Sequence, residues 1–209
     1  DGRYAAVCDY KTGSPKLSLN EIMEGLSLQL ITYLLALSKT KDTKDLLPAA
    51  MMYIYLHGRP KSISVPPNGI SHPKEKENTN GIFLNDPDVL RTLDSQSGTD
   101  DGFIGVSYVK DGSVKKTSPV LTAEEFEALK ALTEKTLIRL YSRLESGEIA
   151  IHPVKNGTLS PCSYCPYRSI CRFDPALPEN SFDYISKVSD KTIREKLDEE
   201  MKRNGKENL

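Results

Sequence analysis

The sequence predicts an α/β fold, because an apolar strand, an amphipathic helix and a second apolar strand follow one another near its beginning. The two strand-like runs, 4–8 and 49–56, are short and apolar. Between them, apolar residues recur with a period close to 3.6 from Leu19 to Leu37, which is typical of a helix. Strand, helix, strand is the order of a crossover unit, so an α/β core is the natural expectation.

Length and charge set the limits of this fold. The chain has 209 residues, enough for one domain with a real core plus appendages. Its formal net charge of −1 gives no global basic field that would indicate a nucleic-acid partner, so such a partner must be argued from motifs. We expect no membrane association, because no apolar run has the length of a membrane span and no signal peptide is recognisable.

The first three residues, Asp1-Gly2-Arg3, resemble a hairpin turn entered from a preceding strand. We therefore expect the chain to be a fragment whose N-terminal part has been removed.

Two capping-box patterns mark the expected starts of helices. Ser18 with Glu21 predicts a helix from about Leu19, and Thr122 with Glu125 predicts a second one. The second helix carries an apolar stripe that we interpret as core packing, with Gly147 as its end: Phe126, Leu129, Leu132, Leu137, Leu140 and Leu144.

The rest of the chain alternates short ordered runs with polar segments. Apolar periodicity is lost in 61–80, which we interpret as a long surface loop. The remaining expectations, in chain order, are order at 81–84, a helix start at 86–90, a strand at 103–109, a turn at 110–113, a partner strand at 114–116, an extended stretch at 148–153 and a polar helix at 190–201.

The run Asp9-Tyr10-Lys11-Thr12-Gly13 follows the first apolar strand directly. Because a strand alternates faces with period two, Asp9 and Lys11 are expected on the same side. A hard divalent cation prefers carboxylate oxygens, and a lysine beside it can orient a water or stabilise developing charge. The alternative is that both side chains are merely solvated at a strand end.

Gln29 and Tyr33 are four residues apart in the first predicted helix and therefore share a face. That face is otherwise apolar, so a buried Gln29 needs hydrogen-bond partners, which an active site would supply. The alternative is a glutamine at the edge of the apolar stripe that reaches water.

Three of the four cysteines, Cys162, Cys165 and Cys171, form a C-x2-C-x5-C pattern. Without a secretory signal this favours metal binding over disulfides, since C-x2-C presents two sulfurs to one ion. The fourth ligand stays open: His152 for zinc, or Cys8 or a cysteine elsewhere for an iron–sulfur cluster. Cys8 lies one residue before Asp9 and alternates away from it, so we expect it to fill the core.

In combination these motifs resemble the RecB-like branch of the PD-(D/E)xK nucleases, and within it the C-terminal nuclease domains of the AddB family of bacterial helicase–nuclease proteins. The segments 81–90, 110–113 and 171–175 add to the resemblance, which covers almost the whole chain.

The resemblance implies a restriction-endonuclease-like core, in which helices flank a central mixed sheet, here N-terminally truncated and closed by an iron–sulfur segment. It implies a nuclease domain over 1–175 that lacks its first strands and contains loop 61–80 and cysteine cluster 162–171. A C-terminal helical tail, 176–209, follows.

The same resemblance assigns roles to residues of the active site. Asp9 corresponds to the second acidic ligand of a Mg2+ ion, and Lys11 to the lysine that positions the attacking water. The backbone carbonyl of Tyr10 completes part of the metal shell. Gln29 and Tyr33 line the site and contact the DNA strand.

For the cysteines, the resemblance implies a structural [4Fe–4S] cluster. Cys162, Cys165 and Cys171 correspond to three of its ligands, and the fourth is a cysteine far upstream, outside this chain. The family's first metal-binding aspartate would likewise precede Asp1, so we expect the fragment alone to be inactive and to hold its cluster poorly.

The function implied is that of a Mg2+-dependent DNA exonuclease within an ATP-dependent helicase–nuclease complex that serves recombinational repair of double-strand breaks in the bacterial cytoplasm. Its partners would be a single DNA strand, an AddA-like subunit and the rest of the same protein. The alternatives are a CRISPR-associated iron–sulfur exonuclease, or a non-catalytic DNA-binding or assembly module that holds iron–sulfur or, through His152, zinc.

Overall fold

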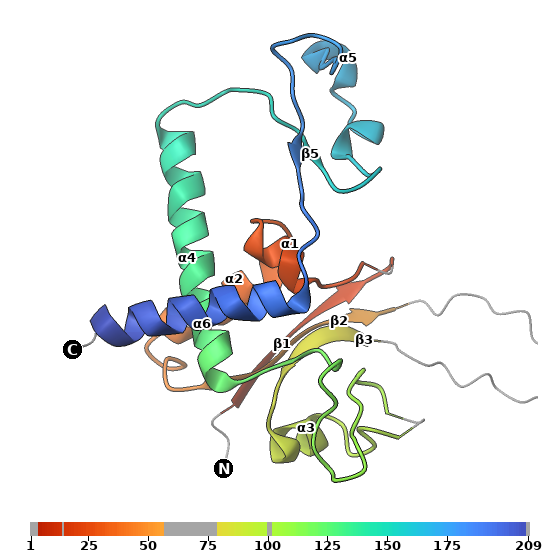
Figure 1. The fold of residues 1–209 in the computed structure, drawn as a ribbon, viewed down its shortest axis with the longest axis vertical. Helices are drawn as coiled ribbons and strands as arrows, with labels where there is room; N and C mark the ends of the chain where they lie inside the picture. The colour runs from red at the N-terminus through yellow and green to blue at the C-terminus, as the bar shows by residue number, and fades with distance from the viewer. Residues whose placement is uncertain (1–3, 14, 57–78, 100–101, 208–209) are drawn as a thin grey trace, which may run out of the picture.

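The computed structural model describes residues 4–13, 15–56, 79–99 and 102–207, in which four strands form one mixed sheet (Figure 1). The strand order is β1 (Tyr4–Lys11), β2 (Leu47–Tyr55), β3 (Thr79–Leu84) and β4 (Val120–Leu121). β1 runs parallel to β2, β3 runs antiparallel to β2, and β4 runs parallel to β3. The predicted crossover and the predicted mixed sheet are thus confirmed.

Alternating residues of β2 serve two different cores, because the strand is covered on both faces. Ala49, Met51 and Tyr53 face helices α1 (Leu19–Met23), α2 (Gln29–Lys39), α4 (Ala123–Glu145) and α6 (Asp190–Glu207). Ala50 and Met52 face α3 (Pro87–Leu93) and the segment 102–118. This double burial explains why the strand reads as a continuous apolar run.

The single helix expected from Leu19 to Leu37 is wrong, because the chain forms two helices there. Gly25 (φ 83°) and Ser27 (φ 51°) adopt left-handed backbone conformations that a helix cannot include. The break ends α1 after one turn and lets α2 start afresh at Gln29, with Leu30, Ile31 and Leu34 packed on the sheet.

Of the two expected capping boxes, one forms. The Thr122 hydroxyl accepts from the Glu125 amide, and the Glu125 carboxylate accepts from the Thr122 amide. Ser18 does lie at the N-cap of α1, but its side chain makes no capping bond. Glu21 accepts instead from the Ser27 hydroxyl (2.9 Å) and from the Asn156 side-chain amide (3.2 Å), so it ties α1 to a distant segment.

Helix α4 bears out its predicted apolar stripe only in its first half. Phe126 and Leu129 are fully buried, whereas Leu140 and Leu144 are exposed, Leu144 to 77%. The difference arises because α4 extends past the sheet, so its last turns have no layer to pack on (Figure 1). Gly147 (φ 72°) follows the helix end, as expected.

The prediction of two paired strands over 103–116 is wrong. Its turn forms, with Asp111 accepting from the Ser113 amide, but pairing is limited to one bridge between Tyr108 and Val114. Ile104 and Val106 are instead buried against the sheet, and this packing replaces the pairing of two strands.

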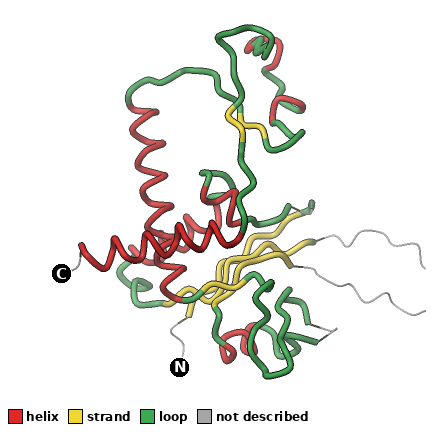
Figure 2. The backbone as a smooth tube through the Cα atoms, in the orientation of Figure 1, coloured by secondary structure: helices red, strands yellow, loops and turns green. Residues whose placement is uncertain are grey.

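Residues 148–187, called the cysteine lobe from here on, lie beyond the end of α4 (Figure 2). The lobe contains a 3-10 turn η1 (Pro161–Ser163), a short helix α5 (Arg168–Cys171) and one small parallel pair, β5 (Val154–Lys155) with β6 (Asp183–Tyr184). The extended stretch 148–153 leads into β5, as expected.

Helix α6 is longer than the predicted 190–201 and packs across α4 (Figure 1). Ile193 and Leu197 enter the main core, and ion pairs join Arg194 to Glu125 and Lys135 to Glu200. The C-terminal part of the chain thus contributes directly to the core.

The expected turn at 1–3 and nearly all of the expected loop 61–80 lie outside the described residues. In the described ranges, no helix combines the length and apolar character needed to cross a membrane.

Candidate active site

β1 places Asp9 and Lys11 on one face of the sheet, as its period of two predicts. Lys11 Nζ lies 2.7 Å from Asp9 Oδ2, and both side chains are partly exposed. The pair faces α2, on the side of the sheet that carries the main core. Tyr53, the β2 neighbour of Asp9, places its ring under the ammonium, 5.1 Å from Lys11 Nζ.

α2 brings Gln29 and Tyr33 to the same corner. Lys11 Nζ donates to Gln29 Oε1 (3.2 Å), and Gln29 Nε2 donates to the Tyr33 hydroxyl (3.2 Å). The four predicted residues Asp9, Lys11, Gln29 and Tyr33 thus form one connected polar chain, named the catalytic corner below. The break at Gly25 and Ser27 makes this possible, because it starts α2 at Gln29.

The charges of the corner are mutually stabilised. Hydrogen bonding to the Asp9 carboxylate is the main cause that raises the pKa of Lys11, and the partial loss of water opposes it. Burial raises the pKa of Tyr53, with the nearby Lys11 ammonium opposing. At neutral pH Lys11 is therefore a cation and Tyr53 a neutral phenol.

Two oxygens of β1 suit a hard cation. Asp9 Oδ2 is buried and, apart from its ion pair with Lys11, accepts no hydrogen bond from a described residue. Lys11 O accepts from Leu56 N (2.9 Å) on the β2 side, so by alternation the Tyr10 carbonyl is directed to the outer side of β1, the first strand of the described sheet. A buried carboxylate oxygen whose one contact among the described residues is the Lys11 ammonium, and a carbonyl on the outer side of β1, fit part of a Mg2+ shell, which is usually completed by waters and substrate phosphate.

The described ranges contain no group of three or more His, Cys, Asp or Glu side chains arranged to hold a metal ion. Among the four residues of the catalytic corner, Asp9 carries the one carboxylate. Cys162, Cys165 and Cys171 are free thiols of intermediate exposure, and neither with one another nor with His152 do they form a ready-made site. His152 Nδ1 lies 3.4 Å from the Ser181 hydroxyl.

Cys8 corrects a further expectation. Its side chain is exposed on the face of β1 opposite to Asp9, so it does not fill the core. The reason is that β1 is an outer strand of the described sheet, and only its Asp9 face is covered by helices.

One residue of the corner was missed from the sequence alone. Tyr53 stood among the apolar residues of a buried strand, and its place under Lys11 follows only from the β1–β2 register. An aromatic residue in the strand that follows the D-x-K strand was the available signal.

The mixed sheet, with an acid–lysine pair on its first described strand and helices packed against it, defines an α/β protein. A family model described as the PD-(D/E)XK nuclease superfamily matches residues 1–172. The chain belongs to this superfamily.

Three similar curated proteins are each named as the B subunit of an ATP-dependent helicase/deoxyribonuclease. The chain is 32% identical over 200 residues to that of Desulforamulus reducens, and the match covers 91% of the chain and 17% of the relative. It is 34% identical over 198 residues to that of Clostridium kluyveri (91% and 17%) and 29% identical over 210 residues to that of Bacillus thuringiensis (96% and 18%). The predicted resemblance is confirmed, and the chain spans less than a fifth of the length of these relatives.

Proposed function

We propose that this chain is the nuclease domain of the B subunit of a helicase–deoxyribonuclease and hydrolyses phosphodiester bonds of a DNA strand in a Mg2+-dependent reaction. The observation that carries the proposal is the connected polar chain from Asp9 through Lys11 and Gln29 to Tyr33, in which the Lys11 ammonium is the one described contact of the buried Asp9 Oδ2. The names of the relatives support a helicase–nuclease assembly more than the CRISPR-associated alternative.

Asp9 and the Tyr10 carbonyl would hold the Mg2+ ion. Bound there, it supplies polarisation of a phosphoryl oxygen and acidification of a water. Before a cation binds, Lys11 neutralises Asp9. With Asp9 Oδ2 engaged in holding the ion, the Lys11 ammonium would turn from that oxygen to the phosphate.

Lys11 acts as a donor. Because contact with Asp9 raises its pKa, Lys11 keeps its proton and cannot serve as a general base near neutral pH. Its N–H groups instead stabilise charge that develops on the phosphoryl oxygens and orient the attacking water. Gln29 Oε1 holds the ammonium in place, and Tyr33, 48% exposed, is positioned to contact the strand.

One carboxylate is fewer than the converging pair that such hydrolysis requires, so we propose that the isolated chain cleaves DNA poorly. The same proposal includes a first metal-binding aspartate outside this chain, which would complete the carboxylate pair. It also includes an AddA-like helicase partner and a role in DNA repair in the cytoplasm. So does a structural [4Fe–4S] cluster on Cys162, Cys165 and Cys171, with its fourth ligand outside this chain.

The test is Asp9→Ala in the complete helicase–nuclease complex. We expect cleavage by this domain to fall about 1000-fold, since metal activation supplies several kcal/mol and each 1.36 kcal/mol is tenfold. The thermal midpoint should stay within a few degrees, because Asp9 lies at the margin of the core. Tyr10→Phe, which keeps the backbone carbonyl, is the matched control and should cleave normally. Undiminished cleavage by Asp9→Ala would exclude Asp9 as a metal ligand.

A further inference from the structure

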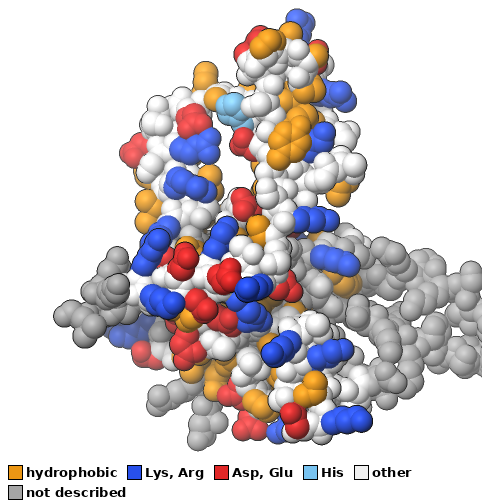
Figure 3. Space-filling model, in the orientation of Figure 1, with side chains coloured by type: hydrophobic (Ala, Val, Ile, Leu, Met, Phe, Trp, Pro, Cys, Tyr) orange, Lys and Arg blue, Asp and Glu red, His pale blue; other side chains and the backbone are white. Residues whose placement is uncertain are grey.

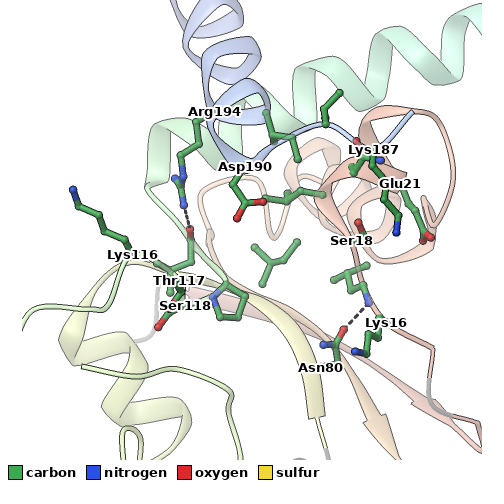
Figure 4. A pocket seen from close by; sticks show the side chains of 18 of the residues that line it. Lys16, Ser18, Glu21, Asn80, Lys116, Thr117, Ser118, Lys187, Asp190 and Arg194 are labelled. Carbon is green, nitrogen blue, oxygen red and sulfur yellow. Dashed lines mark hydrogen bonds between the residues drawn. The ribbon is translucent and has the colours of Figure 1, made fainter. Parts of the chain in front are cut away.

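A cavity of about 550 Å³ lies beside the sheet, and none of the four residues of the catalytic corner lines it (Figure 4). Residues 16–21, the β3 strand, the segment 116–120 and the start of α6 enclose it. Its inner surface is apolar, with contributions from Leu17, Ile82, Val188 and Ile193. Its size falls in the range of small-molecule and cofactor sites.

Three lysines stand around this cavity without a partner. Lys16 and Lys187 lie on one side and Lys116 on the opposite side, where its side chain extends outward (Figure 4). None of the three forms an ion pair or a side-chain hydrogen bond with a described residue. Flexible, unpaired ammonium groups on two sides of a cavity suit an anion on each side.

The other charged groups of the cavity are largely engaged. Arg194 donates to the Glu125 carboxylate and to the Val120 carbonyl (3.1 Å). Glu21 accepts from Ser27 and Asn156. The remaining acid is Asp190, which Figure 4 shows directed from the start of α6 into the cavity. Among the described residues that line the cavity, the charged groups without an ion pair or a side-chain hydrogen bond are therefore three lysines and one aspartate.

Asn20 leaves an acceptor unused in the cavity wall. Its Nδ2 donates to the Ser186 carbonyl (3.1 Å), which fixes the amide, while its Oδ1 is buried and accepts no hydrogen bond from a described residue. A buried acceptor without a donor is costly, so it calls for a partner. Asn20 lines the cavity beside Asp190, whose carboxylate accepts, and amino or imino groups of a nucleobase donate.

The cavity lies on the same face of the sheet as the catalytic corner. Asp9 pairs with Tyr53, and Tyr53 pairs with Asn80, which lines the cavity and accepts from the Leu17 amide. Two strand spacings, roughly 10 Å, therefore separate Asp9 from Asn80 across the sheet. A strand held at Asp9 can reach the cavity within a few nucleotides.

We propose that this cavity binds one nucleotide unit, with its base over the apolar inner surface and against Asn20 and Asp190, and its phosphates at the lysines. Lysines on two sides favour a nucleotide within a DNA strand, because such a nucleotide carries a phosphate on each side. The assignment to the strand rests on the proposed nuclease function. A free nucleoside phosphate shares the chemistry and is separated from the strand by the experiment.

The experiment compares two charge-matched variants of the complete helicase–nuclease complex in Mg2+-free buffer, so that no cleavage intervenes. The cavity variant is Lys16→Ala/Lys116→Ala/Lys187→Ala. The control is Lys115→Ala/Lys191→Ala/Lys196→Ala, which removes the same charge from neighbouring positions outside the cavity. One arm uses oligothymidylate with 4-thiothymidine at successive positions, and the other uses 8-azido-AMP.

After irradiation, peptide mapping locates the cross-links. We expect the oligonucleotide to label peptides from 16–21 or 187–194, and the cavity variant to lose this label about tenfold, the order expected for two lost phosphate contacts. The control should keep it. Labelling by 8-azido-AMP alone, lost in the same variant, supports the nucleotide site and assigns it to a free nucleotide. No labelling in either arm, or labelling equal in both variants, overturns the proposal.

The outcome is independent of the catalytic corner, because no cleavage is measured. If no cross-link forms and the Asp9→Ala complex is inactive, the nucleotide site is rejected and the proposed nuclease function is supported. If the cross-link maps to the cavity and the Asp9→Ala complex is active, the nucleotide site is supported and the role of Asp9 in the proposed nuclease function is rejected.

Discussion

The catalytic corner and the cysteine lobe are built in opposite ways. β1 and α2 anchor the corner through Val7, Leu30 and Ile31, which are buried in the main core. The cysteine lobe has no buried residue between 148 and 187. It exposes Tyr164 and Ile170, each to 79%, and its hydrophobic side chains are visible on the surface in Figure 3.

The contacts that hold the lobe lie at its base. The Phe173 and Phe182 rings meet edge to face at 4.8 Å, and Lys155 lies 4.9 Å from the centre of the Phe182 ring. Cys162 lies on η1, Cys171 ends α5, and Cys165 lies in the turn between these two elements. The main core thus supports the corner, whose side chains are joined by one ion pair and two hydrogen bonds, whereas the lobe rests on a few aromatic and polar contacts and has no buried residue of its own.

The largest expected effect on the free energy of unfolding comes from truncating a side chain of the main core. Leu197→Ala removes a fully buried side chain from α6 and should lower the free energy of unfolding by about 3 kcal/mol. Leu144→Ala on α4, where the side chain is 77% exposed, is the control and should change it by less than about 0.5 kcal/mol. Denaturant melts of the complete protein measure both, and equal effects would show that α6 is not part of the core.

The sequence-based predictions were most accurate where the period of a strand, the period of a helix or a helix-capping pattern determines the local structure. The strand period paired Asp9 with Lys11, the helix period paired Gln29 with Tyr33, and the Thr122 cap gave the start of α4. It failed where the partner is distant in sequence. Glu21 prefers Ser27 and Asn156 to its own helix start, and the exposure of Leu144 depends on where the sheet ends.

The second prediction tests whether a bound group organises the lobe. Cys162→Ser/Cys165→Ser/Cys171→Ser, in the complete protein prepared without oxygen, should lose the absorption near ~400 nm that an iron–sulfur cluster gives. Protease cleavage within 148–187 should rise about tenfold, as expected when local opening becomes easier. Cleavage near β1 and α2 should not change.

Cys8→Ser is the matched control, because Cys8 lies on β1, outside the lobe. It should keep the absorption and the resistance to protease. A colourless wild-type protein that contains zinc would contradict the iron–sulfur proposal and favour the zinc alternative.

A smaller effect is expected from Gln29→Leu, which removes the acceptor for Lys11 but keeps a good helix former at the start of α2. The hydrogen bond is partly exposed, so its loss should cost about 1 kcal/mol of transition-state stabilisation, or roughly fivefold in kcat. Thr32→Ala, on the same helix, is the control. Single-turnover cleavage by the complete complex measures both, and an unchanged rate would mean that Gln29 does not position Lys11.

The smallest expected effect concerns the pH dependence of DNA cleavage, to which Lys11 should contribute little. Contact with Asp9 raises the pKa of Lys11 above its ordinary 10.5, so the ammonium stabilises the folded corner fully below that value. The stabilisation is lost only as pH rises through the raised pKa. Cleavage should therefore show no falling limb from Lys11 between about pH 7 and pH 10.

Lys11→Arg provides the comparison for the pH profile, because its guanidinium keeps its charge throughout. A falling limb between about pH 7 and pH 10 that is present in the wild type and absent in the arginine variant would contradict the prediction, because it would show that Lys11 loses its proton in the range in which the complex cleaves DNA.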